Sequence, residues 1–373
     1  MEIFRGKKIF MTLFPYICIP VTHIFHVSEA QYSDTKPDFL FGRNVLFFRR
    51  FSPSFFMSGI FQKNIISMIQ LKNRSLVSIT DYNKEEMLRI LDIAEDFEKD
   101  HRQKILTNHV IASLFFEPST RTRLSFESAV QYLGGSIIGF ASAGTSSVKK
   151  GESLKDTILT VSNYSDLIVM RNPLDGSARY ASEVSPVPII NAGDGANQHP
   201  TQCLLDLYSI RKTQGTLENI HIAMVGDLKY GRTVHSLVQA LSLFNATFHL
   251  VSPESLKLPS GVKKWIKDAG LEYYQYTDLA DVIPLADIIY MTRIQAERFP
   301  DPMEYEKVKN AYNLESSMLE NSKDNLRILH PLPRVNEISE DVDDHPKAYY
   351  FQQAKNGVYV RQALIAAILG LKE

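Results

Sequence analysis

The sequence places hydroxyl and guanidinium groups side by side at the end of a predicted strand. An apolar run at residues 110–116 is followed by the sequence EPSTRTR at 117–123. Pro118 disfavours a helical conformation before it, and Ser119 is a favoured N-cap for a following helix. The open N–H groups of a first helical turn, the hydroxyls and the forked Arg121 side chain suit a phosphate. We therefore predict an anion site here, with a capped helix bearing surface arginines as the alternative.

Other strand-like runs also end in side chains that can bind an anionic ligand. Arg171 follows the run 167–170, and Thr292-Arg293-Ile294-Gln295 follows the run 288–291. After the run 187–190 a glycine-containing stretch leads to His199, with Pro200 and Gln202 at a predicted helix start. Two arginines in the second half, Arg232 and Arg293, suggest a ligand with two carboxylates.

The sequence GDLKYGRT at 226–233 differs by one residue from a P-loop, because Arg232 stands where the lysine belongs. A nucleotide site therefore stays as an alternative for this segment. An arginine is bulkier than the P-loop lysine, and no apolar run ends in the aspartate that would hold Mg²⁺.

Two loops add candidate groups. The stretch 144–153 is small and polar, and its Lys149 and Lys150 could act in a mobile lid, with a solvated loop as the alternative. The turn HPLPR at 330–334 carries two prolines around Leu332. Such a stiff turn is a candidate for a cis peptide bond, and its carbonyl groups could face a ligand.

Short apolar runs that alternate with helix-like segments indicate buried parallel strands. Helical periodicity follows a capping box formed by Asn83 and Glu86. The sequence predicts an α/β fold with parallel sheets, and ligands in such folds bind at the carboxyl ends of the strands. The strand-like runs lie at 110–116, 167–170, 187–190, 220–225, 288–291 and 326–329.

Composition excludes several classes of protein. The chain has 373 residues, which suggests two domains and a remainder, and its net charge is −1. This balance excludes nucleic-acid binding through bulk positive charge and an acidic, disordered chain. Two cysteines, Cys18 and Cys203, exclude a disulfide framework and a cysteine-based zinc site, and indicate a reducing compartment.

The N-terminal segment differs from the remainder. Residues 1–64 carry a net charge of +4 and 12 of the 21 phenylalanines, whereas the other 309 residues carry −5. A basic start, an apolar stretch too short and broken to span a bilayer, and an acid-poor continuation resemble a targeting segment. We expect a segment that targets the protein to a plastid or mitochondrion, and otherwise a cytoplasmic protein. An extension without structure and a membrane anchor are the alternatives.

Together these motifs resemble the catalytic chain of the aspartate carbamoyltransferase family, from about residue 75 to the C-terminus. The motifs are FEPSTRTR, KKGE, NQHPTQ, VGDLKYGRT, MTRIQ and HPLPR, in the family's order. Ornithine carbamoyltransferase shares the first motif, but it typically has cysteine where this chain has Pro331. Its lid also lacks the lysine found here as Lys150. The aspartate family is therefore preferred, and a subunit without catalytic activity is a further alternative.

The resemblance implies a role for each matching residue. Carbamoyl phosphate would be held by Ser119, Thr120, Arg121, Thr122, Arg171, His199, Gln202, Leu332 and Pro333, with Ser146 and Lys150 from a neighbouring chain. Aspartate would be held by Lys150, Arg171, Arg232, Thr233, Arg293 and Gln295. The catalytic groups would be Thr120, Arg121, Lys150, Arg171 and His199.

The resemblance also implies an organisation. We expect an N-terminal extension at 1–66, a carbamoyl-phosphate domain at 67–205 completed by a C-terminal helix at 356–373, and an aspartate domain at 206–355. Both domains would be doubly wound around parallel sheets, with the ligands in the cleft between them. The family forms homotrimers with shared sites. We expect carbamoyl transfer to L-aspartate in pyrimidine biosynthesis, with no cofactor or metal, no nucleic acid and no stable membrane insertion.

Overall fold

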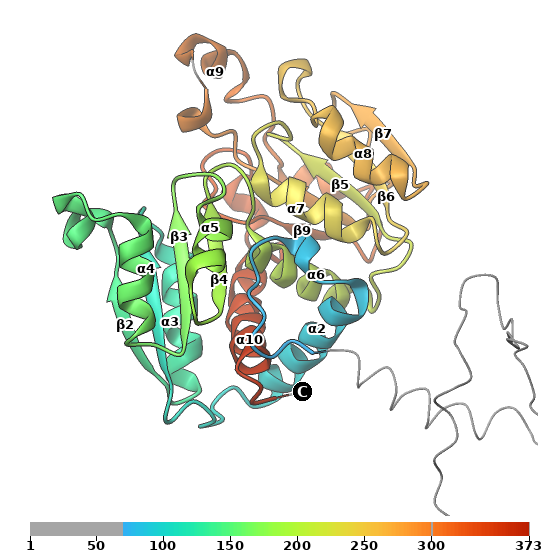
Figure 1. Cartoon of the computed structure of the whole chain (residues 1–373). Coiled ribbons are helices and arrows are strands. Elements are labelled where there is room, and N and C mark those ends of the chain that lie inside the picture. The colour runs from blue at the N-terminus through green and yellow to red at the C-terminus, as the bar shows by residue number, and fades with distance from the viewer. Residues whose placement is uncertain (1–69, 300, 373) are drawn as a thin grey trace, which may run out of the picture. The chain divides into compact units, whose positions relative to one another are not determined.

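The computed structural model describes residues 70–299 and 301–372, which belong to one compact unit, Ile65–Glu373. Two parallel sheets, each with its own helices, form two lobes of this unit (Figure 1). We call them the first and second lobes in chain order. The predictions for the N-terminal segment, including its targeting role, lie outside the described residues. No helix in the described part is long and apolar enough to cross a membrane.

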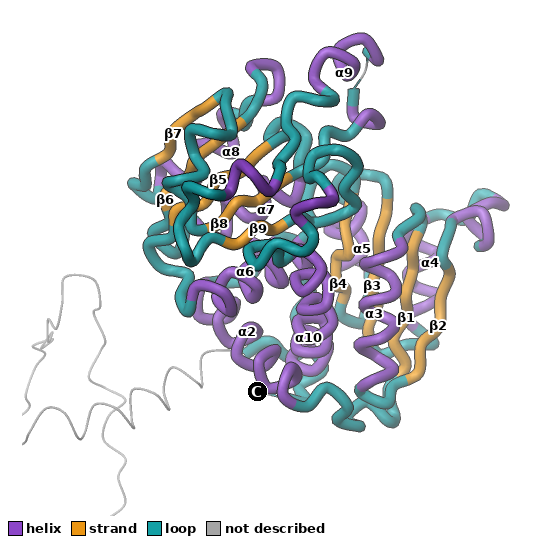
Figure 2. Tube along the Cα trace, turned by 180° about the vertical axis from the view of Figure 1, so that it is seen from behind, coloured by secondary structure: helices purple, strands orange, loops and turns teal. Residues whose placement is uncertain are grey.

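The first lobe is built on a four-stranded sheet in the order β2-β1-β3-β4. Apolar side chains of β1 and β3 alternate between the two faces and are buried on both, as parallel sheets require. Helix α3 covers one face, and α4 and α5 cover the other (Figure 2). The strands are Val110–Phe115 (β1), Ser136–Phe140 (β2), Leu167–Asn172 (β3) and Ile189–Asp194 (β4), and the helices are Thr120–Tyr132 (α3), Leu154–Ser162 (α4) and Ser177–Val184 (α5).

The second lobe is built on a five-stranded sheet in the order β7-β6-β5-β8-β9. Helices α7 and α8 pack on one face, whereas short 3-10 turns and loops around residues 279–342 cover the other. The strands are His221–Val225 (β5), Thr247–Val251 (β6), Tyr273–Tyr276 (β7), Ile288–Met291 (β8) and Arg327–Leu329 (β9), and the helices are Arg232–Leu241 (α7), Ser260–Asp268 (α8) and Pro302–Val308 (α9).

Helices α6 and α10 join the lobes into one core. Helix α6 (Pro200–Gln214) leads from the first sheet to the second, and α10 (Tyr350–Ile368) returns to the first lobe from the end of the second. Helix α10 packs against α2 (Lys84–Lys99), α3 and α6, so the last helix lies among the first ones (Figures 1 and 2). Their apolar faces belong to one buried cluster that also contains side chains of both sheets.

The predicted α/β class with parallel sheets is confirmed. The capping box is also confirmed: Asn83 accepts from the backbone N–H of Glu86 at 2.9 Å, and Glu86 accepts from that of Asn83 at 2.9 Å. Three strands escaped prediction because none of them is a pure apolar run. Strand β2 contains a glycine, β6 contains a buried histidine, and β7 is rich in polar and tyrosine side chains.

Some element boundaries differ from the sequence prediction. Strand β4 begins after Pro188 and runs on to Asp194, because its polar residues Asn191 and Asp194 are themselves buried. The predicted domain boundary at 205/206 falls inside α6, and the C-terminal helix begins at Tyr350 rather than at residue 356. Helix α6 is continuous and buried from Pro200 to Ile210, so no exposed or loop-forming residue marks the boundary between the lobes.

Candidate active site

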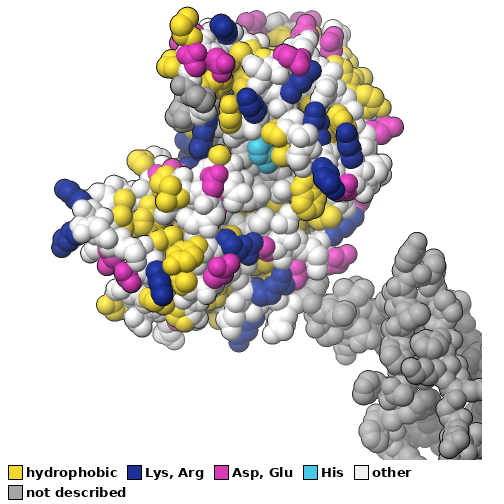
Figure 3. Space-filling model, turned by 45° about the horizontal axis from the view of Figure 1, so that its top comes forward, with side chains coloured by type: hydrophobic (Ala, Val, Ile, Leu, Met, Phe, Trp, Pro, Cys, Tyr) yellow, Lys and Arg dark blue, Asp and Glu magenta, His cyan; other side chains and the backbone are white. Residues whose placement is uncertain are grey.

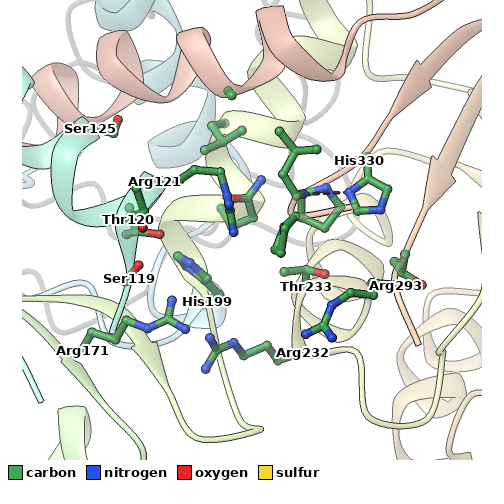
Figure 4. Close-up of a pocket in the computed structure, with 18 of the residues that line it drawn as sticks. Ser119, Thr120, Arg121, Ser125, Arg171, His199, Arg232, Thr233, Arg293 and His330 are labelled. Atoms are coloured by element: carbon green, nitrogen blue, oxygen red, sulfur yellow. Dashed lines mark hydrogen bonds between the residues drawn. The ribbon is translucent and has the colours of Figure 1, made fainter. Parts of the chain in front are cut away.

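A cavity of about 630 Å³ lies where the carboxyl ends of both sheets face each other. The surface of the molecule is hollowed between the two lobes (Figure 3). Side chains from the start of α3, the end of β3 and the start of α6 meet side chains from α7, β8 and the turn after β9 (Figure 4). The cavity therefore lies where the topology of two parallel sheets predicts a ligand.

The structure brings most of the predicted site residues into this cavity. Its lining includes Ser119, Thr120, Arg121, Thr122, Arg171, His199, Gln202, Arg232, Thr233, Arg293, Gln295, Leu332 and Pro333. Ser146 and Lys150 do not line it. They lie on the exposed loop of short 3-10 turns between β2 and α4.

The start of α3 forms an open anion cradle. Ser119 occupies the N-cap position, but its side chain makes no capping hydrogen bond, so the first-turn N–H groups and the hydroxyl face the cavity (Figure 4). Arg121 extends from the first turn into the same space. Burial, and then the charges of Arg171 and Arg293, lower the pKa of Arg121. A bound anion would relieve this repulsion.

Glu117 is the acidic counterpart of the basic side chains in the cavity. Its Oε1 accepts from Arg171 Nε at 2.7 Å and lies 4.0 Å from Arg232 Nη2. Arg171 and Arg232 approach each other from opposite lobes (Figure 4). Burial, followed by the charge of Arg171, lowers the pKa of Arg232 to about 10. Glu117 therefore holds two guanidinium groups close together before any ligand binds.

A glycine makes room for Arg232. Gly193 has φ +119°, and a Cβ atom there would lie 3.2 Å from Arg232 Nη2. The Arg232 side chain donates to the carbonyl of Gly195, which also accepts from Arg298 Nη2 at 3.0 Å. The glycine-containing stretch before His199 thus receives Arg232 and Arg298 of the second lobe.

His199 lies at the start of α6 in the middle of the cavity (Figure 4). Its ring is buried, and Nδ1 makes no hydrogen bond within the described residues. Burial, and then the charges of Arg232 and Arg171, hold the pKa of His199 well below its usual value. The ring is therefore neutral near pH 7, and it can donate a hydrogen bond to a ligand without adding a charge.

The turn after β9 has a defined conformation. The Leu332–Pro333 peptide bond is cis, as the two prolines suggested. The Leu332 N–H donates to His330 Nδ1 at 2.7 Å, so this nitrogen carries no proton, and His330 Nε2 donates to Glu337 at 2.7 Å. These bonds orient Leu332, which lines the cavity.

The geometry of residues 226–233 argues against a P-loop. Within this loop Asp227 Oδ1 accepts from the backbone N–H of Tyr230 at 2.9 Å, which places a carboxylate where a phosphate would need a donor. Arg232 leaves the loop and extends into the interlobe cavity. In the described part of the chain, no three His, Cys, Asp or Glu side chains come together as metal ligands would.

Sequence reasoning missed several lining residues. Glu117 lies inside the predicted phosphate motif and follows a strand, so inspection of the residues after each predicted strand could have identified it. Arg361 was detectable as a basic residue within the apolar helix α10. Arg298 and Gln353 gave no signal, because a loop and a helix bring them in from distant parts of the sequence.

Both lobes match models of known domains. Residues 74–212 match the carbamoyl-phosphate-binding domain of aspartate/ornithine carbamoyltransferases, and residues 218–368 match the Asp/Orn-binding domain. The chain belongs to the aspartate/ornithine carbamoyltransferase family. The predicted resemblance and the carbamoyltransferase fold are thereby confirmed.

Individual members of the family are similar over most of the chain. The aspartate carbamoyltransferase catalytic subunits of Parabacteroides distasonis and Bacteroides fragilis are 63% and 61% identical over 302 residues, which make up 81% of this chain and 99% and 98% of those proteins. The solved catalytic subunit of M. jannaschii aspartate transcarbamoylase is 51% identical with a TM-score of 0.75, over 80% of this chain and 98% of that one.

A second solved structure contains ligands. Aspartate transcarbamoylase from Trypanosoma cruzi, in complex with carbamoyl phosphate and aspartate, is 35% identical with a TM-score of 0.77. The similarity covers 80% of this chain and 98% of that one. These four relatives are all aspartate carbamoyltransferases, which favours the aspartate branch of the family over the ornithine branch.

We predict that His199 stays neutral throughout the usual range of imidazole titration. In ¹⁵N NMR of the histidine-labelled protein, its ring signals, assigned by their loss in His199→Asn, should not shift between about pH 8.5 and about pH 6. Because the folded-state pKa is lowered, the fold disfavours protonation, and stability falls as the pH drops from the unfolded-state pKa of about 6.5 towards the folded-state pKa. A titration midpoint between about pH 6 and about pH 7 would contradict the neutral ring.

Proposed function

We propose that this chain is the catalytic subunit of an aspartate carbamoyltransferase, which converts carbamoyl phosphate and L-aspartate into N-carbamoyl-L-aspartate and phosphate. The observation that carries the proposal is the cavity between the lobes of a chain in this family. An anion cradle at the start of α3 faces Arg232 and Arg293 of the second lobe across it. A phosphate and a dicarboxylate therefore meet at one place.

Carbamoyl phosphate binds in the first lobe. The hydroxyls and N–H groups of residues 119–122 hold its phosphate, with Arg121 as the cation. Thr120, Arg171 and His199 surround its carbonyl oxygen. Gln202 and the carbonyl of Leu332 accept hydrogen bonds from its NH₂ group, and Pro333 shapes the turn beside it.

Aspartate binds from the second lobe. Arg232 and Arg293 bind its two carboxylates, with Gln295 and Thr233 beside them. Arg171 faces Arg232 across the cavity and contacts both substrates. The ion pair of Arg171 with Glu117 holds the guanidinium in place before aspartate arrives.

The reaction needs positioned substrates and a stabilised oxyanion. The neutral α-amino group of aspartate attacks the carbonyl carbon, a C–N bond forms, and negative charge develops on the carbonyl oxygen. Arg121, Thr120, Arg171 and the neutral His199 are preorganised donors for this charge. The C–O bond to phosphate then breaks, and the departing phosphate takes the proton from the amine. Holding both substrates in contact lowers the entropic cost of the encounter.

The site is completed by a second copy of the chain in a homotrimer. Lys150 and Ser146 lie outside the cavity of their own chain, on a loop beside the edge strand β2. Apolar side chains stay exposed on the elements nearby: Leu124 on α3, Ile138 on β2 and Leu159 on α4. Together with the position of the loop outside its own cavity, these exposed side chains support a contact with another subunit on this side of the first lobe. Lys150 then adds a cation to the site of the neighbouring chain.

In the cell, the product N-carbamoyl-L-aspartate feeds pyrimidine biosynthesis, and residues 1–64 direct the protein to an organelle. The net charge of +4 and the acid-poor composition of this segment support such a targeting role. Sequencing the N-terminus of the protein purified from its native cell tests it, and a new N-terminus near the start of the first lobe is expected. An intact residue 1 would favour a cytoplasmic protein.

The choice of amino-acid substrate is a direct test. With carbamoyl phosphate, a colorimetric assay for the ureido product should detect turnover with L-aspartate and none with L-ornithine. Arg232 and Arg293 attract a second carboxylate and repel the ammonium group of ornithine. Turnover with ornithine would assign the chain to the other branch of the family, and Mg²⁺-dependent ATP hydrolysis without carbamoyl transfer would favour the nucleotide site.

A mixing experiment tests whether sites are shared. Arg121→Ala removes a donor from the oxyanion site, and Lys150→Ala removes the cation supplied by the neighbour, so each homotrimer should lose about 10²–10³-fold in kcat. Exchange of subunits between the two variants should restore activity, because some sites then receive both native residues. If mixed trimers form but regain no activity, the site is not built from residues of two chains.

A further inference from the structure

A buried carboxylate lies directly behind the cavity. Asp206 on α6 is fully buried, and its Oδ1 accepts from Gln202 Nε2 at 2.9 Å and from Gln353 Nε2 at 2.6 Å. Its Oδ2 accepts from the Tyr290 hydroxyl at 2.8 Å. Three donors from α6, α10 and β8 thus converge on one side chain that does not itself line the cavity.

The hydrogen bonds continue from Asp206 to the turn after β9. Gln353 Oε1 accepts from the backbone N–H of His330 at 2.8 Å. His330 Nδ1 in turn accepts from the backbone N–H of Leu332 at 2.7 Å. One oxygen atom of Asp206 therefore supports both Gln202 and, through Gln353 and His330, the turn that carries Leu332.

This arrangement determines which end of the Gln202 amide faces the ligand. An ionised carboxylate only accepts hydrogen bonds, so it holds the Nε2 end of Gln202 and leaves Oε1 for the cavity. Burial raises the pKa of Asp206, and the hydrogen bonds from Gln353, Tyr290 and Gln202 oppose this rise. The resulting pKa is about 7. At pH 8 the group is therefore mainly ionised and acts as an acceptor.

We propose that Asp206 is a positioning residue that gives the site its selectivity for a carbamoyl group. It presents Gln202 Oε1 and the Leu332 carbonyl as a pair of fixed acceptors for the two N–H bonds of an NH₂ group. Acetyl phosphate has nearly the same shape but carries a methyl group, and it would leave both acceptors without a donor. The inference rests on the proposed function, because it assigns the NH₂ group to these two acceptors.

The test compares carbamoyl phosphate with acetyl phosphate as donors to L-aspartate at pH 8. Asp206→Leu keeps the branched side-chain skeleton but replaces both acceptor oxygens with methyl groups, so Gln202 and Gln353 lose their common partner. We expect the ratio of kcat/KM for the two donors to fall by about 10–100-fold, mainly through carbamoyl phosphate. Asp206→Asn keeps one oxygen that can accept from both glutamines and should recover most of the selectivity.

Two controls distinguish a positioning role of Asp206 from general damage to the fold. Ser209→Ala removes another buried α6–α10 hydrogen bond, to Asn356 at 3.0 Å and one helical turn away, and should leave the selectivity ratio unchanged. The Kd of inorganic phosphate, measured by calorimetry on the trimeric protein, should stay within about twofold in all three variants because the α3 cradle is untouched.

An equal loss of kcat/KM with carbamoyl phosphate and with acetyl phosphate in Asp206→Leu would overturn the inference, since a structural defect does not distinguish NH₂ from CH₃. The same conclusion would follow if Asp206→Asn were no more selective than Asp206→Leu, or if Ser209→Ala lost selectivity to the same extent. Absence of carbamoyl transfer by the unmodified protein would instead refute the proposed function. The two failures are therefore distinguishable.

Discussion

Repulsion between like charges is the constraint on which the site depends. Among the described residues, the cavity lining contains six arginines, and Glu117 is its one carboxylate. Guanidinium groups cannot lose their protons near pH 7, so the fold must hold their charges together by other means. It does so with side chains anchored on strand ends and helix starts, and with Glu117 between the two lobes. Anionic substrates supply the charge that is missing.

The rest of the architecture follows from this requirement. Parallel strands bring their carboxyl ends to one edge, so two sheets facing each other place basic side chains on two opposite walls. Gly193 leaves space for Arg232 that any side chain would reduce. His199 adds a donor without a charge, since burial among arginines keeps its ring neutral. Gly193 therefore admits one of the cations of the site, whereas His199 supplies a hydrogen-bond donor without adding another charge.

Much of this site could be predicted because strand ends leave a local signature. Arg171, His199 and Arg293 each follow an apolar run, and the cradle at 119–122 combines a cap with hydroxyls. Strands β2, β6 and β7 could not be found in the same way, since an edge position or a buried histidine breaks the apolar pattern. Gln353 also escaped prediction, because only the packing of α10 against α6 brings it to Asp206.

Helix α10 has a consequence for the order in which the protein can become active. It is the last helix of the described chain, yet it packs against α2, α3 and α6 and supplies Gln353 and Arg361 to the cavity. During synthesis, every described strand of both sheets is made before this helix. The first lobe therefore has an uncovered apolar face until α10 has been made, and only then can the cavity acquire its full lining. A nascent chain is thus kept inactive by its own topology.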